Sequence, residues 1–283
     1  MMKLTQRLAI GYVQTKFKLL SVISKKKTAE KAFEIFGTPF MKSVRKGPVK
    51  NAEIIHFNLN HKKMNGYRWN HPQNKKVLIL HGFGSAAHKF EDYATILVAN
   101  GFEVLAFDAP AHGNSEGDTT NAIEYCAMIK QIMQKFGPIE NFIAHSFGGI
   151  SLSLALEDVP HNENTRVVFI APATETTSAV DGAFSMLKLK NEAVRNEFEK
   201  IIVKMTGKKI AWFSIRRAMQ NIKASVLWIH DEDDDITPWN DALKVKEDNH
   251  PNIKFVLTKG LGHRKIYHDE AIKNMVKAFL EAV

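Results

Sequence analysis

The stretch that decides the fold reads NFIAHSFGGISLSLAL and runs from Asn141 to Leu156. Its first residues, 142–144, are apolar and typical of a buried strand. Residues 147–158 are apolar in their first turns and predict a helix, so the chain turns sharply at His145 and Ser146. A strand that runs directly into a helix is one half of a parallel βα unit, and it predicts a layered α/β protein.

The same alternation continues on both sides of this stretch. Short apolar runs predict strands at 76–81, 102–108, 141–146, 166–171, 225–230 and 253–258, and helical patterns occupy 86–99, 119–136, 147–158 and 264–282. Two further runs, 52–59 and 64–69, read as a hairpin at one edge. The sequence therefore predicts an α/β fold with a mostly parallel central sheet of about eight strands, flanked by helices.

One interval interrupts this alternation of predicted strands and helices. Residues 174–223 hold far more chain than a βα crossover needs, and their helical stretches predict an inserted helical cap. The core would then comprise 51–173 and 224–283. The apolar side chains of the cap favour an acyl or other apolar group in a substrate; they are Phe184, Met186, Leu187, Leu189, Trp212 and Phe213.

The net excess of positive charge lies in residues 1–50. The net charge is +9, and residues 1–50 hold 10 Lys and 2 Arg against 2 Glu. Apolar residues recur there at helical spacing, namely Leu8, Ile10, Tyr12, Val13, Phe17, Leu20 and Ile23. Residues 1–50 are therefore predicted to be a basic amphipathic helical segment, a candidate for peripheral contact with an anionic membrane. The alternative is a helix packed on the main domain with its lysines facing water.

Composition also argues against a membrane-spanning protein and against a nucleic-acid-binding protein. No segment has the roughly 20 apolar residues that cross a bilayer. The basic segment lacks the aromatic and basic interleaving of a base-stacking surface, so no nucleic acid is expected as a partner. A single cysteine, Cys126, fits a cytoplasmic protein and, within a helical pattern, predicts a buried structural thiol.

Chemically useful side chains follow the predicted strands. The segments are HGFGS (81–85), DAPAHGNS (108–115), HSFGG (145–149), HDEDDDITP (230–238) and KGLGH, which ends at His263. Ligands of parallel α/β sheets bind at the carboxyl ends of the strands, so these segments are expected to meet.

Ser146, an aspartate of the 231–235 run and His263 occur in the order Ser, Asp, His. With the near-match of residues 144–148 to G-x-S-x-G, this resembles the α/β-hydrolase superfamily, in its serine hydrolase branch with a helical cap. Serine aminopeptidases and monoacylglycerol-lipase-like enzymes share the pattern. The resemblance covers about residues 53–283. Ala144 replaces the usual first glycine, and one extra methyl should fit.

The resemblance implies a role for each matching residue. Ser146 would be the nucleophile and His263 the general base and acid. The family form H-G-x-x-D-x-x-V-P, aligned from His230 to Pro238, selects Asp234 as the acid. The other carboxylates of the run are expected to form a solvated loop, with no metal site and no cofactor.

The same resemblance implies an oxyanion hole made by the backbone N–H groups of Phe83 and Phe147. The residues expected to shape the site without reacting are His81, Gly82, His145 and Gly148. In DAPAHGNS, where relatives commonly have R-G-H-G-x-S, His112 is expected to be a turn residue near the site mouth and not a second base.

The resulting hypothesis is a serine esterase, lipase-like and cofactor-independent, that cleaves a small carboxylic ester or thioester through an acyl-enzyme. Alternatives left open are a catalytically silent binding protein of the same fold, a serine peptidase and a cofactor-free haloperoxidase-like enzyme. A haloalkane dehalogenase is disfavoured, because that branch has aspartate where Ser146 stands. The natural substrate and the oligomeric state stay open.

Overall fold

The computed structural model describes residues 4–40 and 42–282, and these form two compact units. The sheet unit comprises Pro39–Thr174 and the chain from Ser214 onward. The helical unit comprises the chain up to Thr38 together with Glu175–Phe213. Residues 1–3 and 41 of the predicted basic segment lie outside the described residues. None of the described helices is long and apolar enough to span a membrane.

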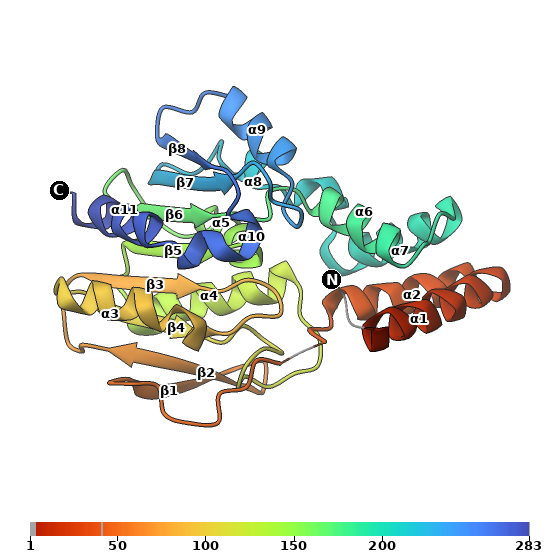
Figure 1. Ribbon diagram of the computed structural model, residues 1–283, viewed down its shortest axis with the longest axis horizontal. Coiled ribbons are helices and arrows are strands. Elements are labelled where there is room, and N and C mark those ends of the chain that lie inside the picture. Colours follow the sequence, from red (N-terminus) through yellow and green to blue (C-terminus); the bar gives the residue numbers. More distant parts are fainter. Residues whose placement is uncertain (1–3, 41, 283) are drawn as a thin grey trace. The chain divides into compact units, whose positions relative to one another are not determined.

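The sheet unit is built on eight strands in the order β1-β2-β4-β3-β5-β6-β7-β8 (Figure 1). Their bounds are β1 Glu53–Leu59, β2 Lys62–Trp69, β3 Lys76–Leu80, β4 Glu103–Phe107, β5 Asn141–His145, β6 Arg166–Ile170, β7 Ser225–Asp231 and β8 Ile253–Thr258. β2 runs antiparallel to both β1 and β4, and all the other pairs are parallel. The predicted mostly parallel sheet with an edge hairpin is confirmed.

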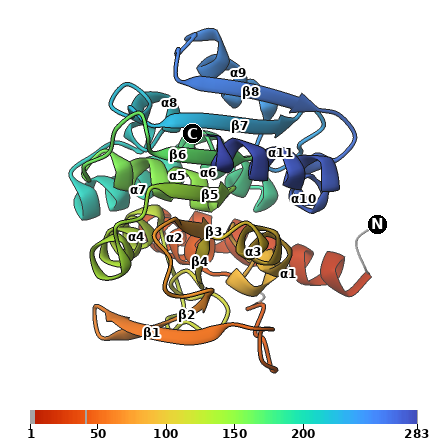
Figure 2. The ribbon, with the colours of Figure 1, turned by 90° about the vertical axis from the view of Figure 1, so that its left-hand side faces the viewer.

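Helices cover both faces of this sheet (Figure 2). The helical segments of the unit are η1 Ala87–Phe90, α3 Glu91–Ala99, α4 Ala122–Phe136, α5 Phe147–Leu156, α8 Ile215–Ala218, α9 Trp239–Glu247, α10 Gly262–Lys265, η3 Ile266–His268 and α11 Glu270–Glu281. α3 and α11 contact each other on one face, and α4, α5, α8 and α9 form a contacting series on the other. The flanking helices that the sequence predicts are therefore present.

The apolar strands are explained by this double cover. Val77 and Ile79 of β3 belong to a core that includes Leu97 of α3 and Val276 of α11. Leu78, between them, points to the opposite face because side chains alternate along a strand, and it too is fully buried. A strand buried on both faces reads as a continuous apolar run, which is why the strand positions could be predicted.

The helix boundaries differ from the prediction where polar side chains cap the backbone. The expected helix 264–282 is divided, because the side chain of Asp269 accepts a hydrogen bond from the Ile272 N–H and starts α11 there. The helical stretches of the insertion form two separate helices. α6 Thr176–Met186 ends before Lys188, whose φ is 52°, and α7 Glu192–Thr206 starts at the Asn191 cap. α9 was not predicted.

The helical unit contains α1 Leu4–Ile23, α2 Lys25–Gly37, α6 Thr176–Met186, α7 Glu192–Thr206 and η2 Ile210–Trp212. Aromatic rings join α2, α6 and α7. Phe33 and Phe36 of α2 and Phe184 of α6 lie around Phe198 of α7, with ring centroids 5.5, 6.1 and 5.2 Å away. The N-terminal helices and the insertion thus share one apolar core. The assignment of the insertion as a cap stays a prediction.

The chain passes between the two units three times, and the two passes that bound the insertion are hydrogen-bonded to each other. In the sheet unit the Ile215 N–H donates to Thr174 O at 2.8 Å, and in the helical unit the Thr176 N–H donates to Phe213 O at 3.1 Å. The insertion therefore begins and ends at adjacent backbone positions, directly after the segment that follows β6.

Candidate active site

Ser146 lies at the point of the sheet where the chain reverses its direction of winding. β3 is flanked by β4 on one side and β5 on the other, and such switch points form crevices at the carboxyl ends of the strands. Ser146 follows β5 directly, with φ 54° and ψ −117°. Left-handed backbone is costly for a residue with a Cβ and persists only where the surroundings enforce it. The strand and the helix therefore meet at a sharp turn with the serine at its apex.

Two small residues let α5 approach the sheet at this turn. A Cβ on Gly148 would lie 2.6 Å from Leu80 O at the end of β3, a distance that no side chain tolerates. Ala144, two residues before the serine, is fully buried in β5 between Leu80 of β3 and Phe169 of β6. The methyl group of Ala144 is accommodated there, as the sequence suggested.

A chain of hydrogen bonds joins Ser146, His263 and Asp234. The Ser146 hydroxyl lies 3.1 Å from His263 Nε2, and His263 Nδ1–H donates to Asp234 Oδ2 at 2.8 Å. All three residues are buried. The three side chains come from the ends of β5, β7 and β8, so the structure brings together the serine, histidine and aspartate that the sequence singled out.

The loop after β7 fixes the carboxylate of Asp234. Its Oδ1 accepts hydrogen bonds from the N–H groups of Ile236 and Thr237, both at 2.8 Å, and the Thr237 hydroxyl donates to Oδ2 at 2.8 Å. Burial alone would raise the pKa of Asp234, but the hydrogen bond from His263 and these N–H groups hold the pKa below its usual value. Asp234 is therefore an anion aimed at His263.

Sequence reasoning missed the role of Thr237. Its hydroxyl lies 3.1 Å from His263 Nδ1 as well as against the carboxylate of Asp234. The only signal was its place one residue before Pro238 in the segment 230–238, where a β-branched residue was expected from the family form.

The expectation that the remaining carboxylates form a solvated loop is wrong for Asp231. Its side chain is fully buried, and Oδ2 accepts hydrogen bonds from the Thr258 hydroxyl at 2.6 Å and the Leu261 N–H at 3.0 Å. Asp231 thus anchors the loop that carries His263. Glu232, Asp233 and Asp235 are exposed, as expected.

Two backbone N–H groups close to Ser146 in the fold are candidates for an oxyanion hole. Within the described part of the chain, neither the Phe147 N–H, at the N-terminus of α5, nor the Phe83 N–H has a protein acceptor. The rings of Phe83 and Phe147 contact each other with centroids 5.7 Å apart, so the two segments are neighbours. Both N–H groups are thus free to bind a ligand oxygen.

Neutral histidines hold the loop that carries Phe83. His81 Nε2 accepts a hydrogen bond from the Ala109 N–H at 2.9 Å, and its Nδ1–H donates to Gly82 O at 2.8 Å. His112 Nε2 accepts from the Gly84 N–H at 2.9 Å, and its Nδ1–H donates to Pro110 O at 2.9 Å. Only a neutral imidazole donates from one nitrogen and accepts at the other. His112 is therefore a turn residue as expected, and it also fixes the adjoining loop.

His145 contacts both the backbone and the ring of His263. Its Nε2–H donates to the backbone oxygen of His263 at 3.2 Å, and the two rings lie 4.8 Å apart. A Cβ on Gly82 would lie 2.9 Å from His145 Nδ1, so the loop after β3 packs directly against this ring. Gly82 and His145 thus pack beside His263, and their role in shaping the site without reacting stays a prediction.

These three histidines predict an acid-sensitive fold. Burial lowers the pKa of His81 to about 4, burial and then His81 lower that of His112 to about 3, and burial and then His263 lower that of His145 to about 3. Below about pH 6.5 the unfolded chain binds protons that the folded chain refuses, so stability falls as the pH falls toward 4. Each histidine is expected to cost about 1.4 kcal/mol of unfolding free energy per pH unit in this window.

Urea unfolding at pH 7.5 and at pH 5.5 measures this loss. His145→Gln keeps a donor near the Nε2 position but cannot titrate, so its stability should depend less on pH than that of the wild type. An unchanged slope in the variant would contradict the assignment of His145.

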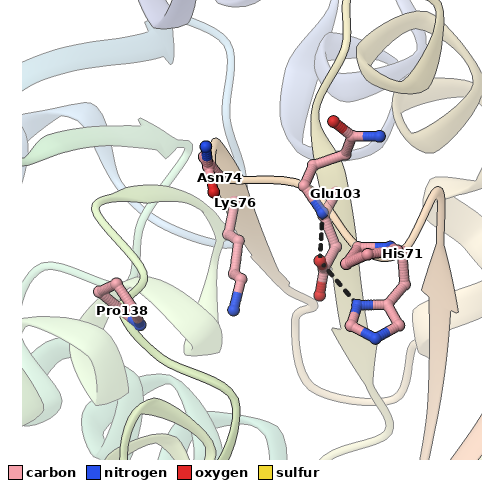
Figure 3. Close-up of a pocket in the computed structure, with 7 residues that line it drawn as sticks. His71, Asn74, Lys76, Glu103 and Pro138 are labelled. Carbon is pink, nitrogen blue, oxygen red and sulfur yellow. Dashed lines mark hydrogen bonds and ion pairs between the residues drawn. The ribbon is translucent and has the colours of Figure 1, made fainter.

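The opposite edge of the sheet holds a pocket of about 380 Å³, drawn in Figure 3. It lies at the amino ends of β3 and β4, where Lys76 and Glu103 begin these strands. The Glu103 carboxylate is fully buried, lies 3.0 Å from His71 Nδ1 and accepts from Arg68 Nε at 3.0 Å. Lys76 Nζ donates to Phe136 O at 2.8 Å. The charged groups of this pocket are therefore paired with other groups of the protein. They hold the amino ends of the neighbouring strands together and do not form a ligand site.

Cys126 is not placed for nucleophilic chemistry. It lies on α4, and burial raises the pKa of its thiol to about 11. A thiol that stays protonated is a poor nucleophile. The prediction of a buried structural cysteine is confirmed.

Comparisons with known proteins agree with this arrangement. A family model described as serine aminopeptidase, S33, matches residues 71–213. Among curated relatives, the Arabidopsis thaliana protein named "Putative methylesterase 15, chloroplastic" is 31% identical over 106 residues, which cover 36% of this chain and 24% of the relative. Norfluorocurarine synthase 1 of a Strychnos species is 33% identical over 109 residues, covering 36% of this chain and 40% of the relative. The matches thus span less than half of either relative.

Among solved structures, an esterase of Pyrococcus furiosus is similar with a TM-score of 0.64 and 21% identity, over 85% of this chain and 97% of that chain. At this identity the likeness shows the fold, which is that of the α/β-hydrolases. The resemblance stated from the sequence is confirmed. Because the family model covers half of the 283 residues and the eight-stranded sheet has this fold, the chain belongs to the serine aminopeptidase S33 family of the α/β-hydrolases.

Proposed function

We propose that this protein is a cofactor-independent serine hydrolase that cleaves a carboxylic ester or thioester through an acyl-enzyme. The observation that carries the proposal is the continuous hydrogen-bond chain from Ser146 Oγ through His263 to Asp234. A serine hydroxyl is a weak nucleophile until a base removes its proton, and the base needs a carboxylate to set its tautomer. The three groups meet both requirements.

In the acylation step Ser146 Oγ attacks the carbonyl carbon of the ester, and His263 Nε2 takes the hydroxyl proton. Asp234 stabilises the imidazolium that forms. The carbonyl oxygen gains negative charge and is bound by the N–H groups of Phe83 and Phe147, aided by the positive end of the α5 dipole. The tetrahedral intermediate then collapses, and His263 passes its proton to the departing alcohol or thiol.

In the deacylation step a water molecule takes the place of the leaving group. His263 Nε2 removes a proton from this water, which attacks the acyl carbon bound to Ser146. The same two N–H groups stabilise the second tetrahedral intermediate. Its collapse returns the proton to Ser146 Oγ and releases a carboxylic acid, so no metal or redox group takes part in any step.

The names of the similar proteins favour an ester over the alternatives. One relative is named a methylesterase, and the Pyrococcus furiosus protein is an esterase. The family description favours a second candidate, an aminopeptidase, which would use the same nucleophile and base on an amide. Parallel assays with p-nitrophenyl esters and aminoacyl p-nitroanilides separate the two, because an aminopeptidase prefers the anilides.

A fluorophosphonate probe tests the proposal directly. The folded protein is expected to form one covalent adduct, located at Ser146 by tandem mass spectrometry, and to lose p-nitrophenyl acetate hydrolysis in proportion to labelling. Ser153→Ala, on the same helix, should label like the wild type, since its hydroxyl only bonds Ile150 O. Folded protein that neither labels nor hydrolyses any ester of a panel of acyl lengths would point to a silent binding protein.

A further inference from the structure

Helix α1 is held in the helical unit by one of its faces. Phe17 is buried, and Val13 and Leu20, about one turn away on either side, are partly buried. The Gln14 side chain donates from Nε2 to Met186 O at the end of α6, at 2.7 Å. These contacts set the rotation of α1 about its axis and therefore determine which side chains it turns to solvent.

The solvent-exposed residues of α1 include several large apolar side chains. Tyr12, Leu19, Val22 and Ile23, called here the α1 stripe, are 71%, 63%, 78% and 81% exposed. Positions 12, 19 and 23 lie within about 40° of one another around a helix of 3.6 residues per turn, and position 22 lies about 60° from position 19. Elsewhere in the described chain, Phe40 is the one large apolar side chain of similar exposure. Single exposed apolar residues are ordinary, but a contiguous set marks an interaction surface.

Unpaired cations occur in α1 and in the first turn of α2, which follows it directly. Lys16, Lys18, Lys26 and Lys27 are exposed, and within the described residues none of the four forms an ion pair. The first acidic residue of the chain is Glu30. Lys16 lies inside the stripe, one turn from both Tyr12 and Leu19, so two copies packed through this face would bring like charges together. A surface rich in negative charge and able to receive apolar side chains fits better.

We propose that the α1 stripe is a docking surface for an anionic lipid bilayer. The four apolar side chains enter the boundary between headgroups and acyl chains, and the four lysines extend to the lipid phosphates. Lysine suits this position, because its alkyl stem packs on apolar surface while its ammonium group reaches the polar layer. Apolar burial and attraction to anionic headgroups then act together, as in other interfacial helices.

Sedimentation with vesicles tests this in the full-length protein. Binding to phosphatidylcholine vesicles that contain phosphatidylglycerol is expected to exceed binding to pure phosphatidylcholine by about tenfold or more, and to fall as salt is raised. Leu19→Ser/Ile23→Ser should lower the partition coefficient by about tenfold or more. Lys16→Gln/Lys18→Gln should lower it by about fivefold for each lysine.

Matched variants on the sheet unit control for general surface effects. Ile54→Ser removes an exposed apolar residue from β1, and Lys246→Gln removes an exposed cation from α9. Both should bind vesicles like the wild type. All variants are at exposed positions, so their thermal midpoints should match that of the wild type, and Tyr12→Ser/Val22→Ser provides a second stripe pair.

Three results would overturn the proposal. The first is sedimentation of both stripe pairs at the wild-type level, and the second is equal binding of the wild type to neutral and anionic vesicles. The third is a wild-type dimer in light scattering that the stripe variants convert to monomer while no vesicle binding occurs. In that case the α1 stripe would join two copies of this chain.

Discussion

Replacing Ser146 with alanine is expected to lower kcat for ester hydrolysis by at least about 10⁴-fold. The variant loses the atom that we propose to form the acyl-enzyme, and neighbouring hydroxyls cannot replace it. KM should change little, since the N–H groups of Phe83 and Phe147 remain. The fold should persist, because among the described residues the hydroxyl bonds only His263, and alanine fits the space of serine. Steady-state kinetics on p-nitrophenyl butyrate, with thermal unfolding of the same samples, measures both effects.

Ser153→Ala is the matched control for this experiment. It makes the same substitution on α5, where the hydroxyl donates to Ile150 O at 2.8 Å, and should leave kcat within about twofold. A Ser146→Ala variant that keeps more than a tenth of wild-type activity would exclude Ser146 as the nucleophile.

Asp234→Asn is expected to lower kcat by about 10³ to 10⁴-fold while leaving the geometry almost unchanged. The N–H groups of Ile236 and Thr237 both require an acceptor at the Oδ1 position. The amide nitrogen must then take the Oδ2 position, 2.8 Å from His263 Nδ1. There it donates to Nδ1 and moves the imidazole proton to Nε2, facing Ser146. A histidine protonated at Nε2 cannot accept the serine proton.

Asp235→Asn is the control for the second prediction. Asp235 is the adjacent residue, is exposed, and should tolerate the change with kcat within about twofold. Asp231→Asn tests the neighbouring buried carboxylate, and it should lower the thermal midpoint more than it lowers kcat. If kcat falls in Asp235→Asn and not in Asp234→Asn, the assignment of the acid is wrong.

Much of the fold could be predicted because the sheet is buried on both faces. Strands such as β5 and β6 contain continuous apolar runs, 142–144 and 167–170, which distinguishes them from the helices around them. The strand order and the antiparallel attachment of β2 depend on pairing between distant segments, and local periodicity carries no signal for them. α9 was missed because its buried residues are few, with Ala242 and Val245 facing inward among charged neighbours.

The candidate site was predictable to the extent that its side chains follow strands directly. Ser146, Asp234 and His263 could be proposed because each follows a predicted strand in a family-like segment. The structural roles of Asp231 and Thr237 could not be proposed, because their hydrogen-bond partners Thr258, Leu261 and His263 are remote in sequence. The N-terminal segment shows a related difficulty. α1 has apolar residues on two faces, so spacing alone could not tell that Phe17 is buried while Tyr12 and Ile23 are exposed.

The paired passage between the two units has an evolutionary consequence. Thr174 and Ile215 are joined by a backbone hydrogen bond, so the chain leaves the sheet unit and returns to it at almost the same point. A segment with neighbouring ends can be lengthened, shortened or exchanged without shifting any strand. Descendants of this chain can therefore diversify the insertion while inheriting Ser146, Asp234 and His263 unaltered.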